Sequence, residues 1–301
     1  MKHVSNLLVL ARRGPLVVLI ASALALVTLP ASASGLVRSV ASQHSTHARL
    51  SDGLQVTKPT IVLVHGAWAD ASSWGRVTQI LQDEGFTVVA PPNTLRGISH
   101  DSAVLANYLK TIAGPIVLVA HSYGGAVVTN AATGNPNVKQ LVYVDAFMPA
   151  QGETIGQLLS QMPGSCVLAN PSDAFTLSTD PSQPAGDPDA YLKGPASGNY
   201  MGFDQCFANS VAPKQAALLE AGQRPIAVGA LSEPSGAPAW STIPSWALIG
   251  SEDHVIPPAE LTFMAKRAGS RIEYVKAGHV SMVAQPLQVA KVITQAAQAA
   301  S

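Results

Sequence analysis

The sequence predicts an α/β domain with a mostly parallel, doubly wound sheet of about six strands. Short apolar runs rich in β-branched residues, bounded by Gly, Pro and Asn, alternate along the chain with segments of helical periodicity. This alternation is typical of parallel strands joined by crossover helices, which cover both faces of the sheet. A long segment without alternation follows the fourth strand and predicts an insertion.

Six runs qualify as strands, because each is apolar and β-branched and is too short for a helix. They lie at residues 60–64, 87–90, 115–120, 140–144, 245–249 and 271–275. The predicted helices lie at residues 74–84, 102–112, 123–132, 259–267 and 287–299. Gly85 is the stop signal of the first helix. Residues 59–300 are thus expected to form the folded domain.

The amino-acid composition excludes several classes of protein. The chain has 301 residues, of which 47% are hydrophobic and 12% are charged, with 18 Lys and Arg against 18 Asp and Glu. Soluble domains carry about 25% charged residues, so a disordered chain of high charge is excluded. The balance of charge excludes a basic nucleic-acid-binding protein. Two cysteines are too few for a disulfide-built scaffold or a cysteine-rich zinc site.

Residues 1–33 have the pattern of a secretory signal peptide. Lys2 and the pair Arg12-Arg13 precede an apolar run over residues 16–29, and an A-x-A cleavage signal ends at Ala33. The run is shorter than the about 20 residues of a spanning helix, and an uncleaved membrane anchor is the alternative. The arginine pair leaves the general and the twin-arginine export routes open. We expect a secreted or periplasmic protein without a stable membrane anchor.

Cleavage after Ala33 leaves 15 basic against 18 acidic residues, a net charge of −3. This charge argues further against nucleic acid as a partner. Residues 34–58 are polar and aperiodic, which indicates a linker or disordered arm. His44 and His47 in this arm have the spacing of metal ligands, but no third ligand is nearby, so we interpret them as a solvated pair.

The strongest motif is Ala120-His121-Ser122-Tyr123-Gly124, which joins the third strand to a helix. A strand, a sharp turn carrying Ser and a helix are typical of a nucleophile elbow, which lifts the Ser oxygen clear of the sheet. Ala120 stands where the motif usually has Gly. The helix N-terminus favours negative charge that develops beside Ser122. A Ser that merely caps a helix is the alternative interpretation.

The first strand runs into His65-Gly66-Ala67-Trp68. Gly66 lets the following amide turn inward, so the N–H groups of Ala67 and Tyr123 would form an oxyanion hole. His65 and His121 flank this site at strand ends. We expect each to be a buried histidine bonded to backbone rather than a catalytic group.

The base is expected at His279, in the loop after the last strand, where a chain with the order Ser, acid, His places it. The acid is expected in the loop after the preceding strand. Asp253 is favoured there because it lies deepest in the turn, whereas Glu252 is expected to face solvent and His254 to have no role. Asp145, after the fourth strand, is the less favoured alternative acid.

Together these motifs resemble the α/β-hydrolase superfamily, in the branch of bacterial esterases, plant methyl esterases and hydroxynitrile lyases. The resemblance covers about residues 58 to 300 and rests on five segments in this order, at residues 65–68, 120–125, 143–149, 253–258 and 278–279. It implies a core of six strands, a cap after the fourth strand, and no metal ion or organic cofactor. Hydroxynitrile lyases of this branch need a Lys directly after the catalytic His, where this chain has Val280. Ser122 in place of Asp argues against a haloalkane dehalogenase.

The predicted activity is hydrolysis of small or medium carboxylic esters, with lactones as a variant, through an acyl-enzyme. Ser122 would attack the acyl carbon, His279 would move the proton, and Asp253 would orient the imidazole. The expected partner is a small-molecule ester. Cleavage of a C–C or amide bond at the same site is one alternative, and a non-catalytic binding module is the other.

The insertion, about residues 150–240, is interpreted as a cap or lid, because long loops are uncommon unless they serve a site. It carries eight acidic against three basic residues, which favours neutral substrates. Trp68, Phe203 and Trp240 are the expected substrate contacts, in an apolar, aromatic-walled pocket. The alternative is that the aromatics only pack the cap onto the core. The cap aromatics are Phe175, Tyr191, Tyr200, Phe203, Phe207 and Trp240.

Cys166 and Cys206, both in the cap, are expected to form a disulfide, because export would place them in an oxidising compartment. Two buried free thiols are the alternative. The bond would close a loop that contains Phe175 and Phe203. It would therefore hold the aromatic wall of the cap rather than the sheet.

Overall fold

The computed structural model describes residues 58–168, 171–179, 181 and 186–300. The expected signal peptide, the arm except for its last residue, and the pair His44 and His47 lie outside these residues. Among the residues described, no helix is long and apolar enough to cross a membrane.

The main sheet has six parallel strands in the spatial order β2-β1-β3-β4-β8-β9. They are β1 (Thr60–Val64), β2 (Val88–Val89), β3 (Ile116–His121), β4 (Val138–Val144), β8 (Ser245–Gly250) and β9 (Arg271–Val275). β3 and β8 are buried along their whole length, as is typical of strands covered on both faces. The prediction of an α/β fold on a six-stranded parallel sheet is confirmed.

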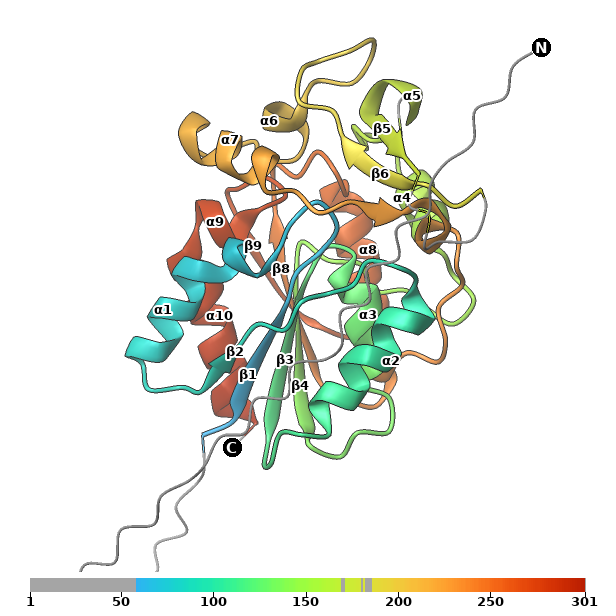
Figure 1. Cartoon of the computed structure of the whole chain (residues 1–301). Coiled ribbons are helices and arrows are strands. Elements are labelled where there is room, and N and C mark those ends of the chain that lie inside the picture. The colour runs from blue at the N-terminus through green and yellow to red at the C-terminus, as the bar shows by residue number, and fades with distance from the viewer. Residues whose placement is uncertain (1–57, 169–170, 180, 182–185, 301) are drawn as a thin grey trace, which may run out of the picture. The chain divides into compact units, whose positions relative to one another are not determined.

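Helices lie on both faces of this sheet (Figure 1). One face carries α1 (Gly75–Asp83) and α10 (Pro286–Ala299), and the other carries α2 (Ile98–Leu109), α3 (Gly124–Ala131) and α8 (Pro258–Arg267). α10 buries Val289, Ile293 and Ala296, which recur at helical spacing on one side. Pro258 and Pro286 begin their helices, where the missing N–H of proline costs nothing.

α2 begins at Ile98 rather than at the predicted residue 102. Gly97, which precedes the helix, has a φ of 148°, a conformation that side chains rarely adopt. The first turn then buries Ile98 and Asp101. The additional turn depends on the conformation of the loop before the helix. Helical periodicity in the sequence does not predict that conformation.

The cap segment, defined here as residues 150–240, leaves the main sheet after β4 and returns to it at β8. Figure 1 shows β5, β6, α6 and α7 together at the end of the sheet where the parallel strands finish. β5, β6 and β7 form a separate antiparallel sheet, which the sequence analysis did not predict because its strands are short. The elements are α4 (Ile155–Gln161), α5 (Pro171–Ala174), β5 (Phe175–Ser178), β6 (Asp189–Leu192), α6 (Phe203–Cys206), α7 (Pro213–Ala221), β7 (Ile226–Ala227) and the 3-10 helices η2 (Val228–Leu231) and η3 (Ala239–Ser241).

One buried acid in α8 is unusual. Glu260 is 0% exposed, and neither of its carboxylate oxygens has a hydrogen-bond partner among the residues described. Burial, and then the charge of Glu153, raises the pKa of Glu260 to about 7, against the opposing charge of Arg267. Arg267 is itself bonded to Glu153, at 2.6 and 2.8 Å. Glu260 is therefore protonated in the folded protein at mildly acidic pH.

We expect Glu260→Gln to change how stability depends on pH. Between the ordinary pKa of about 4.5 and the raised pKa of about 7, the folded chain holds a proton that the unfolded chain releases. Stability of the wild-type protein therefore falls as pH rises through this interval, and the neutral amide removes that fall. Melting temperatures at pH 5 and pH 8 should show a gain for Glu260→Gln only at pH 8. The exposed Asp83→Asn is the control, and an equal effect of Glu260→Gln at both pH values would contradict the prediction.

Candidate active site

The turn between β3 and α3 places Ser122 in a conformation that non-glycine residues rarely adopt. Its φ is 53°. A Cβ at Gly124 would lie 2.9 Å from the carbonyl oxygens of Val64 and of the residue that follows it. A Cβ at Gly125 would lie 2.2 Å from the carbonyl oxygen of Phe147. The glycines after Ser122 are therefore required by the close approach of two neighbouring strand ends.

Three of the predicted site residues meet at this turn. The Nε2 atom of His279 lies 2.9 Å from the Oγ of Ser122, and its Nδ1 atom lies 2.8 Å from the Oδ2 of Asp253. The other oxygen of Asp253 accepts the N–H groups of Val255 at 2.8 Å and Ile256 at 2.9 Å. All three side chains are buried. Hydrogen bonds thus join Ser122 to His279 and His279 to Asp253, and backbone N–H groups hold the carboxylate of Asp253 in place.

The electrostatics of His279 suit a proton acceptor. Burial lowers the pKa of His279 below its ordinary value, so the imidazole is neutral. With Nδ1–H donated to Asp253, the lone pair of Nε2 faces the hydroxyl of Ser122. This arrangement can remove the Ser122 proton as a bond forms at Oγ.

The loop after β1 lies against Ser122 at Gly66. A Cβ at Gly66 would come within 2.6 Å of the Cβ of Ser122, so only glycine fits there. The next residue, Ala67, is buried, as is Tyr123. Within the ranges that the structure describes, neither Ala67 nor Tyr123 donates its backbone N–H to a carbonyl oxygen. Buried N–H groups are rarely left unpaired, so these two are candidates to bind a ligand oxygen.

His65 and His121 are buried and bonded to backbone, which confirms the predicted burial and backbone bonding of both. His65 donates Nδ1–H to the carbonyl oxygen of Gly66 and accepts the N–H of Asn93 at Nε2, each at 2.9 Å. His121 donates Nε2–H to the carbonyl oxygen of His279 at 2.9 Å. Burial lowers the pKa of both imidazoles. These neutral rings hold the two loops that surround Ser122.

Asp145, the alternative acid, does not contact His279. Its carboxylate accepts the N–H of Gly250 at 2.6 Å and the N–H of Ser281 at 3.2 Å. Burial, and then the charge of Asp253, raises the pKa of Asp145 well above its ordinary value. Asp145 therefore ties the end of β8 to the loop after His279.

Aromatic side chains of the cap segment cover the site. The ring of Phe207 lies 5.3 Å from that of His279, 5.0 Å from Phe203 and 6.2 Å from Trp68, and Trp68 stacks on Phe175 at 5.7 Å. These four residues, Trp68, Phe175, Phe203 and Phe207, are called the aromatic cluster below. Under it, Ser122 is only 2% exposed. Phe207, one of the cap aromatics, is not among the three substrate contacts that the sequence predicts.

The structure does not bring Trp240 to this cluster. Its indole N–H donates to the carbonyl oxygen of Pro149 at 3.1 Å, and its ring lies 5.9 Å from the guanidinium of Arg267. Trp68 and Phe203, the other two predicted substrate contacts, both lie against Phe207, which in turn contacts the ring of His279.

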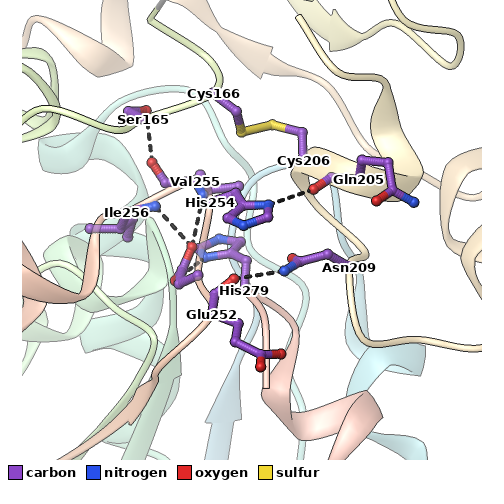
Figure 2. Close-up of a disulfide and its surroundings, with 11 residues drawn as sticks. Ser165, Cys166, Gln205, Cys206, Asn209, Glu252, His254, Val255, Ile256 and His279 are labelled. Atoms are coloured by element: carbon purple, nitrogen blue, oxygen red, sulfur yellow. Dashed lines mark hydrogen bonds and ion pairs between the residues drawn. A yellow bond between two sulfur atoms is a disulfide. The ribbon is translucent and has the colours of Figure 1, made fainter. Parts of the chain in front are cut away.

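The two cysteines form the expected disulfide, with Cα atoms 5.8 Å apart. The N–H of Cys166 donates to the carbonyl oxygen of His254 at 2.8 Å, and the Nδ1 of His254 donates to the carbonyl oxygen of Gln205 at 2.8 Å. Figure 2 shows this cross-link beside Val255. His254, expected to have no role, therefore bonds to both sides of the disulfide.

The cap also bonds to residues 252–256, called the acid loop below because they contain Asp253. The Oγ of Ser165 donates to the carbonyl oxygen of Val255 at 2.7 Å, and the Nδ2 of Asn209 donates to that of Glu252 at 2.6 Å. The disulfide was expected to hold the aromatic wall rather than the sheet. It does adjoin that wall, since Phe207 follows Cys206, but it also anchors the loop that leaves β8.

A cavity of about 460 Å³ lies between the end of β2 and α2, and Ser122 is not among its lining residues. Its walls are mostly apolar, with Asn93, Thr94 and Asp101 as polar members. In the part of the chain that is described, no three His, Cys, Asp or Glu side chains are grouped so that they could hold a metal ion.

A model of the alpha/beta hydrolase family matches residues 61–292. The chain belongs to this family. It is 33% identical over 111 residues to the carbendazim hydrolyzing esterase of Nocardioides sp. (strain SG-4G), a match that covers 33% of this chain and 46% of that protein. It is 27% identical over 188 residues to the putative methylesterase 13, chloroplastic, of Arabidopsis thaliana, covering 57% of this chain and 40% of that protein. The chain spans less than half the length of these curated relatives.

Solved structures share the fold at lower identity. The pyrethroid hydrolase from Sphingobium faniae JZ-2 has a TM-score of 0.64 at 20% identity, covering 80% of this chain and 98% of that one. Polyneuridine aldehyde esterase has a TM-score of 0.63 at 20% identity, covering 79% and 99%.

The two buried acids are expected to differ in their effect on turnover. Asp253→Asn should lower kcat by about 10⁴-fold, because the amide favours the wrong tautomer of His279. Asp145→Asn should cost far less, since Asp145 bonds to the N–H groups of Gly250 and Ser281 and not to His279 among the residues described. Steady-state hydrolysis of p-nitrophenyl butyrate, with folding checked by circular dichroism, measures both. The reverse ranking would move the acid's role to Asp145.

Loss of the disulfide is expected to lower both stability and turnover. The chain-entropy model gives about 4 kcal/mol for closing a loop of 40 residues. Turnover should fall because the cross-link is bonded to the acid loop. Melting curves and kcat of the reduced protein are compared with those of a Cys166→Ser, Cys206→Ser double variant, which should match it. An unchanged melting temperature after complete reduction would refute the expectation.

Proposed function

We propose that this chain is an exported serine hydrolase that cleaves small or medium carboxylic esters, lactones included, through an acyl-enzyme. The observation that carries the proposal is the hydrogen-bonded series from Ser122 through His279 to Asp253 at a strained turn. Membership of the alpha/beta hydrolase family, with esterases among the relatives, supports this chemistry.

In the first half-reaction, His279 Nε2 takes the Ser122 proton as Oγ bonds to the acyl carbon. The electron pair of the carbonyl moves to its oxygen, which accepts the N–H groups of Ala67 and Tyr123. Asp253 stabilises the imidazolium without taking its proton. As the carbonyl re-forms, the bond to the alcohol oxygen breaks, and His279 returns the proton to the leaving alcohol.

Water completes the cycle in the second half-reaction. His279 removes a proton from water as its oxygen bonds to the acyl carbon, and the same two N–H groups receive the oxyanion. The bond between the acyl carbon and Ser122 Oγ then breaks, and Oγ takes the proton from His279 as the carbonyl re-forms. The products are one carboxylic acid and one alcohol, and the resting enzyme is restored.

Neutral esters with an apolar acyl or alcohol part are the substrates that the surroundings favour. Trp68, Phe203 and Phe207 offer aromatic surface near the reacting atoms. Because Ser122 is 2% exposed, a substrate reaches Oγ only when the aromatic cluster moves aside. We include Phe207 among the substrate contacts and leave Trp240 out.

Export is part of the proposal. The N-terminal pattern with an A-x-A signal ending at Ala33 supports it. The paired Cys166 and Cys206 are consistent with an oxidising compartment. Secretion and a periplasmic location are both compatible with these features.

Ser122→Ala should abolish hydrolysis of p-nitrophenyl acetate and butyrate by the purified protein, because it removes the nucleophile. A fluorophosphonate probe should add its mass to the wild-type peptide that contains Ser122 and leave Ser122→Ala unmodified. Ser245→Ala is the matched control, because Ser245 is also buried and hydrogen-bonded, at 2.6 Å to Ser270, but lies at the start of β8. Hydrolysis that persists in Ser122→Ala would refute the assignment, and absence of an adduct would favour a binding module.

A further inference from the structure

The side chain of Tyr123 is held by a buried carboxylate that the reaction itself does not use. The Tyr123 hydroxyl donates to Asp101 Oδ2 at 2.9 Å, and both side chains are buried. Burial, and then the charge of Asp101, raises the pKa of Tyr123, so the hydroxyl remains a donor. Tyr123 also supplies one of the two N–H groups of the proposed oxyanion hole. The hydrogen bond therefore anchors the residue whose backbone must face the reacting oxygen.

Asp101 is in turn fixed by the loop that joins β2 to α2. The N–H of Arg96 donates to both carboxylate oxygens, at 3.0 and 3.2 Å, and the hydroxyl of Thr94 donates to Oδ1. Each oxygen of Asp101 thus has a donor, which holds the carboxylate in one orientation.

The same loop holds the segment that carries the other oxyanion donor. The N–H of Asn93 donates to Nε2 of His65 at 2.9 Å, and its side-chain amide donates to the carbonyl oxygen of His65 at 3.1 Å. His65 is followed by Gly66 and Ala67. Residues 93–101 therefore bond to both segments that provide an N–H group beside Ser122.

The loop also bonds to the cap segment. Arg96 Nη1 lies 2.6 Å from Asp189 Oδ1 in β6, and the carbonyl oxygen of Leu95 accepts the N–H of Ala227 in β7 at 3.0 Å. Leu95 is fully buried with a φ of 60°, a strained conformation that its surroundings maintain. The loop is thus restrained by the cap, by the end of β1 and, through Asp101, by the side chain of Tyr123.

We propose that Asp101 is a positioning residue for the oxyanion hole, acting through the hydroxyl of Tyr123. The peptide between Ser122 and Tyr123 follows a residue at positive φ, so its orientation needs an anchor beyond the turn. The ring of Tyr123 supplies that anchor at a distance from the reacting atoms. This inference rests on the proposed function, since it concerns stabilisation of the oxyanion in ester cleavage.

Tyr123→Phe tests the proposal with the least change in shape. We expect kcat for p-nitrophenyl butyrate to fall about 10-fold or more, less than the about 10²- to 10³-fold that follows loss of a whole donor, with KM unchanged. A trifluoromethyl ketone forms a tetrahedral adduct with an anionic oxygen, and its affinity should fall by the same factor. Affinity for butan-1-ol, which has neither a carbonyl nor an anionic oxygen, should not change. A merely structural role would not separate these two ligands.

Tyr143→Phe is the matched control. Tyr143 is also buried, and its hydroxyl is hydrogen-bonded to Thr129 at 2.8 Å, but it lies in β4 away from the oxyanion donors. Its loss should lower the melting temperature and leave kcat and ketone affinity unchanged. Asp101→Asn combined with Tyr123→Phe should cost no more in kcat than the larger single effect, because both act on one hydrogen bond.

The outcomes separate this inference from the proposed function. If Ser122→Ala is inactive but Tyr123→Phe keeps its kcat and ketone affinity within twofold of wild type, the role of Asp101 is overturned and the serine mechanism stands. Additive losses in the double variant would also overturn it. If Ser122→Ala retains activity, the proposed function fails first.

Discussion

The reversal of the chain at Ser122 is the constraint on which the site depends. With a φ of 53° at Ser122, the backbone passes from β3 to α3 within two residues, Ser122 and Tyr123. The carbonyl oxygens at the ends of β1 and after β4 lie so close that positions 124 and 125 have no space for a side chain. The elbow and the two strand ends therefore pack as one unit. His279 and Asp253 lie in loops that follow other strands, and these loops must hold their side chains in place beside Ser122.

Buried polar side chains bonded to backbone hold those loops in place. His121 bonds to the carbonyl oxygen of His279, and Asp145 bonds to Gly250 at the end of β8 and to Ser281 after His279. A buried polar group without its partner costs about 1–3 kcal/mol, so each such bond favours one position of the loop. The result is a set of donors and acceptors that is in place before a substrate arrives, which is the main source of electrostatic catalysis.

Local signals in the sequence were enough for the fold and for Ser122. β1 and β9 have the predicted ends, because a Pro or Gly lies within three residues of each end of both strands. The elbow is contiguous in the chain, and the order of the last two loops indicated His279 and Asp253. Contacts of the cap were not predictable, since Phe207 over His279 joins segments far apart in sequence. The bond from Tyr123 to Asp101 likewise depends on where α2 begins.

The Cys166–Cys206 disulfide beside the acid loop would form late on the proposed export route. Thiols are kept reduced before export, so a chain on the proposed route lacks the Cys166–Cys206 bond while it remains inside the cell. On that route the cap would hold the acid loop by hydrogen bonds alone, and oxidation would add the covalent restraint only after the membrane has been crossed. The proposed ester hydrolase would then be least rigid in the compartment that contains the esters of its own cell.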